Sequence, residues 1–132
     1  MDHAATMRRM YELISAGDID GFGDLIADDL VEHEEAPGFE STKEGVKQVF
    51  HMYRAAFPDL RMEPQDIIVC GDKVVARMSF SATHTQPLLG IAPTGRRFTL
   101  RTIDIWRVEN GKFAEHWDIV DYQGLQKQLR GE

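Results

Sequence analysis

The order of the sequence patterns constrains the fold of this chain more than any single motif does. Apolar residues recur at helical spacing in the first half, whereas apolar and polar residues alternate in the second half, as they do in strands. Helices are expected at residues 4–16, 18–26, 43–57 and 122–129, the third opened by a Ser41–Glu44 capping box. Strands are expected at residues 62–70, 73–85, 96–108 and 112–121. The Gly71-Asp72 and Asn110-Gly111 turns predict antiparallel pairing of successive strands.

This segregation of helices and strands predicts an α+β fold. We expect a curved, mostly antiparallel sheet wrapped around the N-terminal helices, forming a cone with an internal pocket. The length of 132 residues and the 42% hydrophobic composition suit a single domain over residues 1–132, large enough to enclose a core and a ligand pocket.

The composition excludes several kinds of partner. The net charge is −7 and no cluster of Lys and Arg exceeds a pair, so no nucleic acid is expected to bind. The single cysteine, Cys70, cannot form an internal disulfide or a Cys-rich metal site, which is typical of a reducing cytoplasm. No apolar run is long enough to span a bilayer, and the N-terminus lacks the apolar core of a signal peptide. We therefore expect a cytoplasmic protein with no membrane partner.

The last expected strand carries the clearest chemical signal. An ordinary half-buried strand separates its charged and apolar side chains onto opposite faces. In residues 112–121 both faces mix ionisable and apolar groups, so one face is expected to line a cavity that holds polar groups. His116 and Asp118 share a face two residues apart, and an imidazole beside a carboxylate is suited to proton transfer.

The two preceding strands place further polar residues on the expected inner face. One inward row is Val74, Ala76, Met78, Phe80, Ala82 and His84, and the other is Phe98, Leu100, Thr102, Asp104 and Trp106. A two-residue hairpin loop pairs Ile103 with Asp118, which leaves Asp104 on the opposite face. A bulge or a three-residue loop puts Asp104 and Asp118 on one face. The alternation of side chains along the two strands does not decide between these two pairings.

Several short motifs occur in an order that resembles one family over nearly the whole chain. They are Ala16-Gly17-Asp18, Phe57-Pro58-Asp59, Gly71-Asp72-Lys73-Val74, Thr83-His84-Thr85, the segment 90–97, Asn110-Gly111-Lys112, Glu115-His116-Trp117-Asp118 and Gln128-Leu129. The chain resembles the SnoaL-like polyketide cyclases of the ketosteroid-isomerase-like α+β cone superfamily. The resemblance implies that Asp118 is the acid/base of a ring-closing aldol enzyme and that position 104 faces the pocket. This chain departs from those cyclases by carrying Asp104 where they carry His.

The candidate site combines these patterns with the resemblance. The expected catalytic residues are Asp118, Asp104 and His116, and the expected substrate-binding residues are His84, His33, Tyr53, Phe80, Trp106 and Leu88. Burial raises the pKa of a carboxylic acid toward neutrality, so a pocket aspartate can take a proton from a carbon next to a carbonyl group and return it to an alkoxide. The enolate oxygen needs a donor, for which the candidates are His116, His84, Tyr11 and Tyr53.

This chemistry requires neither a cofactor nor a metal. The sequence contains no glycine motif for nucleotide binding and no nucleophile elbow, and it has no helical His-x-x-x-His spacing. The expected partner is a small hydrophobic molecule that contains a carbonyl group.

Candidate residues also have structural interpretations. Asp118 can be a structural carboxylate that is bonded to a loop. Asp104 can pair with an arginine, and His116 can lie on the outer face of the sheet. His84 can be a solvated strand end. His33 lies in the acidic segment 31–35, whose charges favour a solvated loop.

Three functions remain open from the sequence. The first is a cofactor-independent cyclase or isomerase acting on a carbonyl compound. The second is an epoxide hydrolase of the limonene-epoxide type, for which Asp104 and Asp118 supply two carboxylates, although Thr102 stands where that family has an arginine. The third is a non-catalytic binder of small apolar ligands, or a scaffold dimer. A fold of this kind hosts all three, so fold alone does not decide between them.

Two apolar surfaces complete the expectations. The segment 86–95, with Leu88 and Leu89, is apolar for a hairpin connection and is expected to form a lid over the pocket; the alternative is a hydrophobic plug on the sheet. The outer face of the last two strands offers Ile103, Ile105, Trp117 and Ile119 within a charged rim, which predicts a homodimer. The alternative is that the C-terminal tail covers this patch within one chain.

Overall fold

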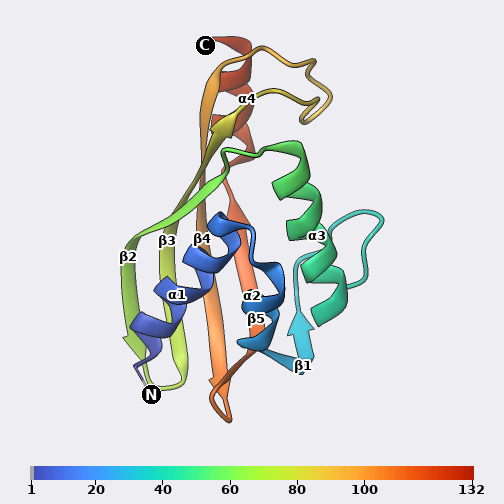
Figure 1. Ribbon diagram of the computed structural model, residues 1–132. Helices are drawn as coiled ribbons and strands as arrows, with labels where there is room; N and C mark the ends of the chain where they lie inside the picture. Colours follow the sequence, from blue (N-terminus) through green and yellow to red (C-terminus); the bar gives the residue numbers. More distant parts are fainter. Residues whose placement is uncertain (1) are drawn as a thin grey trace.

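The computed structural model of the chain, drawn as a ribbon in Figure 1, describes residues 2–132. Its helices are α1 (His3–Ala16), α2 (Ile19–Asp24), α3 (Lys43–Ala56) and α4 (Tyr122–Arg130). Its strands are β1 (Ile26–Glu32), β2 (Arg61–Cys70), β3 (Lys73–Thr83), β4 (Arg97–Glu109) and β5 (Lys112–Val120). Within residues 2–132, no helix combines the length and the apolar character that crossing a membrane requires.

One five-stranded sheet organises the molecule, in the order β1-β5-β4-β3-β2. Strands β2 to β5 form an antiparallel meander, whereas β1 pairs with β5 in parallel. Helices α1, α2 and α3 lie over one face of the sheet, which we call the inner face (Figure 1). The predicted α+β class, with N-terminal helices on a mostly antiparallel sheet, is confirmed.

Strand β1 is the element that the sequence pattern does not predict. The second helix ends at Asp24 and not at Ile26, and Ile26 instead starts a strand by pairing with Phe113. Aspartate is depleted in strands, so the adjacent Asp28 and Asp29 obscure the strand pattern. The parallel partner lies far along the chain, where no local turn motif announces the pairing.

Helix α3 begins one residue later than the expected capping box implies. Thr42 is the N-cap, and its hydroxyl oxygen accepts a hydrogen bond from Gly45 N at 3.1 Å. The predicted Ser41–Glu44 box is therefore wrong, because the third helical residue is Gly45 and has no side chain to bond back. A Cβ at Gly45 would lie 1.8 Å from the Glu40 carbonyl oxygen, so only glycine fits where α3 meets the preceding loop.

The core lies in two parts along the inner face. The part under α1 and α2 includes Met10, Ile14, Phe22, Trp106 and Phe113. The part between the end of α3 and α4 includes Phe57, Phe80, Phe98, Leu125 and Leu129. Along α3, the apolar residues Val46, Phe50 and Tyr53 are only half-buried against these two parts. A helix whose apolar stripe is incompletely covered leaves apolar surface free for a ligand.

The register of β4 and β5 decides which residues share the inner face. Val108 pairs with Phe113 but Arg107 pairs with Glu115, so Ala114 is an extra residue on β5. This β-bulge leaves Phe113 and Ala114 both buried and reverses the parity of the residues that follow. Asp104 consequently pairs with Asp118, and the bulged register is the one that the chain adopts.

Candidate active site

Strands β4 and β5 bring three ionisable residues together on the inner face. Asp104 pairs with Asp118 across the two strands, and the neighbouring His116 pairs with Trp106. One polar side-chain atom from each of Asp104, His116 and Asp118 lies within 4.8 Å of the other two. The three residues expected to be catalytic are therefore neighbours, and two of them, Asp104 and His116, are buried.

A fourth residue, Glu32 at the end of β1, completes this cluster. Its two carboxylate oxygens lie 2.7 and 2.8 Å from His116 Nδ1, while His116 Nε2 lies 2.9 Å from Asp104 Oδ1. The Glu32 side chain is only 6% exposed. Sequence reasoning misses Glu32 because it does not predict β1. The available signal is the two-residue spacing from the buried Leu30, which puts both side chains on one face of a strand.

His116 is held as a cation between two carboxylates. Burial by itself would lower the pKa of His116, but its hydrogen bonds to Asp104 and Glu32 outweigh burial and raise the pKa to about 10. The imidazolium ring donates one N–H to each carboxylate, so neither nitrogen is free to exchange a proton with a substrate. The alternative that His116 lies on the outer face of the sheet is wrong, because the ring is buried on the inner face.

The same bonding bears on metal binding. Within residues 2–132, Asp104, His116 and Asp118 are the group whose polar atoms converge closely enough to hold an ion. A metal needs a free lone pair on the imidazole, whereas both nitrogens of His116 are directed at carboxylates. Because a carboxylate faces each nitrogen, His116 is suited to hold a proton on both nitrogens and not to bind a metal. The absence of a metal from the site stays a prediction.

Asp118 is the member of the cluster whose carboxyl group is free. Within residues 2–132, no donor lies within hydrogen-bond distance of its side-chain oxygens, and its backbone N–H contacts the Glu34 carboxylate at 3.4 Å. Burial raises the pKa of Asp118, the charge of Asp104 adds to the rise, and the His116 cation opposes it, with a resulting pKa of about 7. A carboxyl group that titrates near neutrality can both remove and return a proton at physiological pH.

Asp104 holds the cluster together and is itself fully bonded. Its Oδ2 accepts a hydrogen bond from Thr102 Oγ1 at 2.6 Å, and its Oδ1 accepts one from His116. Its partners are thus a threonine and a histidine, and not the arginine of the structural interpretation. With both oxygens bonded within the protein, Asp104 supplies negative charge beside Asp118 and does not need a ligand to satisfy it.

Trp106 forms the wall next to the cluster. Its ring lies 4.1 Å from the ring of His116, between centroids, and its Nε1 donates a hydrogen bond to Tyr11 Oη at 3.1 Å. The indole is buried, so it shields the imidazolium from water on this side. Trp106 remains a predicted substrate-binding residue.

Tyr53 on α3 and Phe80 on β3 continue the inner face away from the cluster. Their rings meet edge to face with 5.5 Å between centroids. Phe80 lies four residues beyond Ala76, the residue that pairs with Asp104, which is about 13 Å along the strand. A ligand with several rings could therefore place its reacting end at Asp118 and its other end against Tyr53 and Phe80.

His84 is buried but lies far from the cluster. It lies just past the end of β3, eight residues beyond Ala76, or about 26 Å along the strand direction. Its Nδ1 lies 3.0 Å from Thr94 Oγ1 and accepts a hydrogen bond from Thr94 N at 3.2 Å. The structure does not bring His84 to Asp118, and it is not a solvated strand end either. Its visible role is to hold the segment 86–95 onto β3.

His33 lies on the outer face of the sheet. Its ring stacks on Trp117 with 4.9 Å between centroids, and its Nε2 lies 2.6 Å from Glu115 Oε2. Glu115 and Trp117 point away from His116 because they alternate with it along β5. The structure therefore does not bring His33 together with the other predicted substrate-binding residues.

Leu88 packs against the second part of the core, next to Ile91, with which it forms an isolated bridge. This position favours the hydrophobic plug over the lid for the segment 86–95. We expect Leu88→Ser to lower the free energy of unfolding by about 1–3 kcal/mol, because a half-buried apolar side chain is replaced by a hydroxyl. The KM should stay unchanged. Urea unfolding and steady-state kinetics measure the two quantities.

The matched control is Leu89→Ser, because Leu89 is exposed and has little packing to lose. A rise in KM for Leu88→Ser with an unchanged unfolding midpoint would contradict this expectation and restore the lid.

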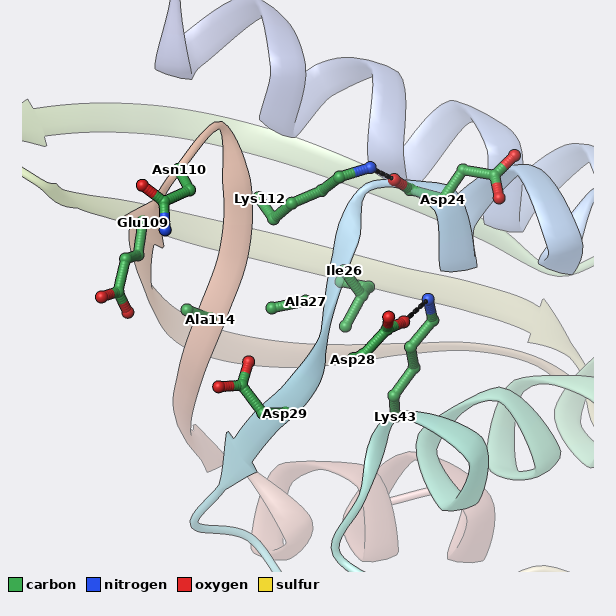
Figure 2. A pocket seen from close by; sticks show the side chains of 10 residues that line it. All are labelled: Asp24, Ile26, Ala27, Asp28, Asp29, Lys43, Glu109, Asn110, Lys112 and Ala114. Atoms are coloured by element: carbon green, nitrogen blue, oxygen red, sulfur yellow. Dashed lines mark hydrogen bonds and ion pairs between the residues drawn. The ribbon is translucent and has the colours of Figure 1, made fainter.

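Two hollows lie apart from the buried members of the cluster. One, of about 380 Å³, lies where the start of β1 meets the β4–β5 hairpin, and Figure 2 shows the side chains around it. The ammonium groups of the two lysines that line it already have partners within the protein. Lys43 Nζ donates to Asp28 Oδ1 at 2.9 Å, and Lys112 Nζ donates to the Asp24 carbonyl oxygen. The other, of about 410 Å³, lies over the outer face of β4 and β5, and its lining includes the half-buried Asp118. The expected internal pocket therefore stays a prediction, which the half-buried stripe of α3 supports.

The fold and the cluster define the class of this chain: an α+β protein whose helix-covered sheet carries ionisable side chains suited to acid/base chemistry. A comparison with protein families agrees, because the family described as SnoaL-like polyketide cyclase matches residues 4–129. The chain belongs to the SnoaL-like polyketide cyclase family.

Its relatives include ester cyclases. The chain is 30% identical to aklanonic acid methyl ester cyclase AcmA of Streptomyces galilaeus, over 97% of this chain and 90% of that protein. It is 31% identical to nogalonic acid methyl ester cyclase of Streptomyces nogalater, over 70% of this chain and 69% of that protein.

Among solved structures, TsrD from Streptomyces laurentii is 34% identical with a TM-score of 0.85, covering 98% of this chain and 97% of that one. Wild-type IdmH from Streptomyces antibioticus is 33% identical with a TM-score of 0.87, covering 98% and 99%.

Proposed function

We propose that this protein is a cofactor-independent polyketide cyclase that closes a ring by an intramolecular aldol reaction, with Asp118 as the general acid and base. The observation that carries the proposal is the free Asp118 carboxyl group, whose pKa of about 7 lies where one residue can serve in both steps. Family membership supports the reaction class, because the relatives named above are cyclases.

The reaction needs two proton transfers. Asp118 as carboxylate takes a proton from the carbon next to a carbonyl group, and the C–H electron pair forms the enolate. The enolate carbon attacks a second carbonyl carbon of the same molecule, which forms the C–C bond and leaves an alkoxide. The alkoxide then takes the proton from the Asp118 carboxylic acid, and the enzyme returns to its starting state. General acid/base catalysis of this kind contributes roughly 10²–10⁴-fold.

The substrate class follows from the relatives and the walls of the site. Two curated relatives are cyclases of polyketide methyl esters. Aromatic side chains, Trp106 beside the cluster and Tyr53 and Phe80 beyond it, suit a hydrophobic molecule with several rings. We propose a small hydrophobic polyketide that contains at least two carbonyl groups, and no metal or organic cofactor.

Aklanonic acid methyl ester is the substrate with which to test the reaction. Ring closure conserves mass, so chromatography coupled to mass spectrometry should show a product of equal mass, and carbon NMR should show the loss of one ketone. In D₂O the enzyme should exchange the proton on the reacting carbon. Epoxide hydrolysis instead would incorporate ¹⁸O from water into a diol. A failure to catalyse exchange or closure on a panel of such ketones would contradict the proposal.

We also propose that the protein is a homodimer formed through the outer face of β4 and β5. The apolar patch consists of Ile103, Ile105, Trp117 and Ile119, and Ile119 is 76% exposed. The C-terminal tail does not cover this patch, because Leu125 and Leu129 of α4 are buried against Phe98 in the core. An apolar centre within a charged rim is the usual anatomy of a self-associating surface.

Trp117→Glu should dissociate this dimer, because a carboxylate in the centre of the patch would be desolvated without a partner. Sedimentation at micromolar concentration should give twice 15.0 kDa for the wild type and 15.0 kDa for the variant. The matched control is Ile68→Glu on β2, another exposed apolar position on a strand, which should remain a dimer. A wild type that sediments as a monomer would exclude the proposed assembly.

A further inference from the structure

Two charged side chains on the outer face of the sheet lack a close partner within the chain. Three arginines on this face each lie 2.7–2.8 Å from a carboxylate oxygen, in the pairs Arg77–Asp66, Arg101–Asp121 and Arg107–Glu115. Lys73, at the start of β3, has only the adjacent Asp72 within ion-pair distance in the described part of the chain, at 3.7 Å. Glu34, which follows β1, is exposed and forms no ion pair with any of residues 2–132.

These two charges lie on the rim of one apolar hollow, the hollow of about 410 Å³ over the outer face. They flank the apolar patch, because Lys73 starts β3 whereas Glu34 contacts Asp118 N on β5, and β4 lies between those two strands. Helices α1, α2 and α3 cover the inner face and leave this side of the sheet open (Figure 1). An apolar floor with one unpaired charge of each sign on its rim is complementary to a second copy of itself.

A two-fold contact through this hollow pairs the two charges. In a symmetric dimer the same patch of both copies meets, so a two-fold axis that crosses the patch between its rims sets one rim against the other. Lys73 of each copy then lies against the partner's Glu34, and the contact occurs twice. Glu34 Oε1 faces Asp118 N, whereas Oε2 accepts no hydrogen bond from residues 2–132 and can accept one from the lysine.

Glu34 also connects this surface to the catalytic aspartate. Its Oε1 accepts a hydrogen bond from Asp118 N at 3.4 Å. Burial is the largest cause of the raised pKa of Asp118, and the negative charges of Asp104 and Glu34 add to it. The titratable groups that interact electrostatically with Asp118 are Asp104, His116, Glu32, Glu34, Tyr11, Tyr53 and Tyr122. A cation beside Glu34 offsets one of the negative charges and therefore lowers the pKa of Asp118.

We propose that a second copy docks on the outer face through two symmetric ion pairs between Lys73 and the partner's Glu34, so that each copy places a cation beside the active site of the other. Lys73 is then a positioning residue, which acts on the partner's Asp118 through Glu34 and does not touch the substrate. The net charge of −7 makes two copies repel each other, and the two ion pairs offset this repulsion at the interface. The contact depends on the proposed homodimer, and its effect on the reaction depends on the proposed role of Asp118.

Reversing the charge on each rim tests the contact. Lys73→Glu sets two acids against each other across the interface, and Glu34→Lys sets two lysines against each other. Each variant alone should therefore dimerise at least about 10-fold more weakly than the wild type. An equimolar mixture allows one copy of each variant to combine, which restores an ion pair at both contacts. Sedimentation should show the wild-type mass for the mixture at concentrations where each variant alone is a monomer.

The mixture distinguishes a pair between copies from a pair within one chain, because only the former is restored by mixing. Labelling one variant with ¹⁵N lets native mass spectrometry identify the mixed dimer. The matched controls are Glu12→Lys on α1 and Lys127→Glu on α4, which make the same charge changes at exposed helical positions. Each control should dimerise as the wild type does, and circular dichroism shows whether all four variants fold.

The link to Asp118 is measured without turnover, by following the NMR signal of its ¹³C-labelled carboxyl carbon as the pH changes. In Lys73→Gln the pKa of Asp118 should be about 0.3 higher than in the wild type, the effect of losing a unit positive charge about 10 Å away in water. Lys127→Gln removes an equal charge from α4 and should leave the titration of Asp118 unchanged.

The outcomes separate this contact from the proposed function. A wild-type dimer whose affinity is unchanged by Lys73→Glu and Glu34→Lys, or variants that do not combine on mixing, would overturn the contact and leave the homodimer standing. A monomeric wild type would overturn both. An identical titration of Asp118 in the wild type and in Lys73→Gln would overturn the link to the active site. None of these results depends on turnover, which tests the proposed reaction separately through Asp118→Asn.

Discussion

Asp118→Asn should lower kcat for ring closure by at least about 10²-fold while the fold remains intact. Asparagine has nearly the same size as aspartate but neither accepts nor returns a proton near neutral pH. Within residues 2–132, the Asp118 carboxyl group accepts no hydrogen bond, so its replacement breaks no bond that stabilises the fold. Initial rates with a polyketide ketone measure the first effect, and thermal melting measures the second.

The pH dependence gives a second signature of the same residue. As a general base, Asp118 must be ionised in the free enzyme, and its pKa is raised from 3.8 to about 7. The kcat/KM of the wild type should therefore rise tenfold per pH unit below about pH 7 and level off above it. The residual rate of Asp118→Asn should lack this inflection.

The matched control is Asp66→Asn, on the exposed surface of β2 and paired with Arg77 at 2.7 Å. That variant should keep both the wild-type rate and its pH profile. Near-wild-type turnover in Asp118→Asn on the true substrate would remove Asp118 from the mechanism.

The helices and the antiparallel meander could be predicted because their signals are local. Helical spacing and the Asn110-Gly111 turn each act within a few residues, and the observed elements agree with the expected ones to within a few residues. The strand β1 could not be predicted in this way. Its pairing with β5 joins segments far apart in the sequence, so the tertiary structure stabilises a segment whose own residues, Asp28 and Asp29, disfavour a strand.

The site depended on two such non-local features. The bulge at Ala114 alone puts Asp104 and Asp118 on one face, and alternation along the strands could not choose between the two registers. Glu32 comes from the unpredicted strand, yet it is the second carboxylate that holds His116. His84 illustrates a different limit. The alternation of side chains along the strand correctly predicts which face of the sheet His84 shares, but it does not predict how far His84 lies from Asp118.

His116→Leu is expected to have the largest effect on stability. It removes the cation between Glu32 and Asp104 and leaves two buried carboxylates facing an apolar side chain. Breaking a buried ion pair by removing one partner typically costs about 3–5 kcal/mol, because the remaining charge stays desolvated. Urea unfolding at pH 7, followed by tryptophan fluorescence, should show a loss of this size.

The pH dependence of stability tests the cause of this loss. The pKa of His116 is about 10 in the folded protein, whereas 6.5 is the ordinary value for histidine and applies to the unfolded chain. The folded state therefore binds the proton more tightly than the unfolded state does. The contribution of His116 is then fully present below about pH 6.5 and is lost as the pH rises through about 10, a change on the order of 5 kcal/mol. In His116→Leu this decline between pH 6.5 and 10 should disappear.

His33→Leu is the matched control for that experiment. His33 also contacts a carboxylate, at 2.6 Å from Glu115, but its side chain is 40% exposed. Exposed ion pairs contribute about 0–1 kcal/mol because water screens them, so this variant should unfold nearly as the wild type does and keep its pH dependence. Equal stability of the His116 and His33 variants at pH 7 would contradict a buried imidazolium that offsets the desolvation of two carboxylates. Because the same cluster sets the charges around Asp118, that outcome would also remove the physical basis for its pKa of about 7 and for its role as a base.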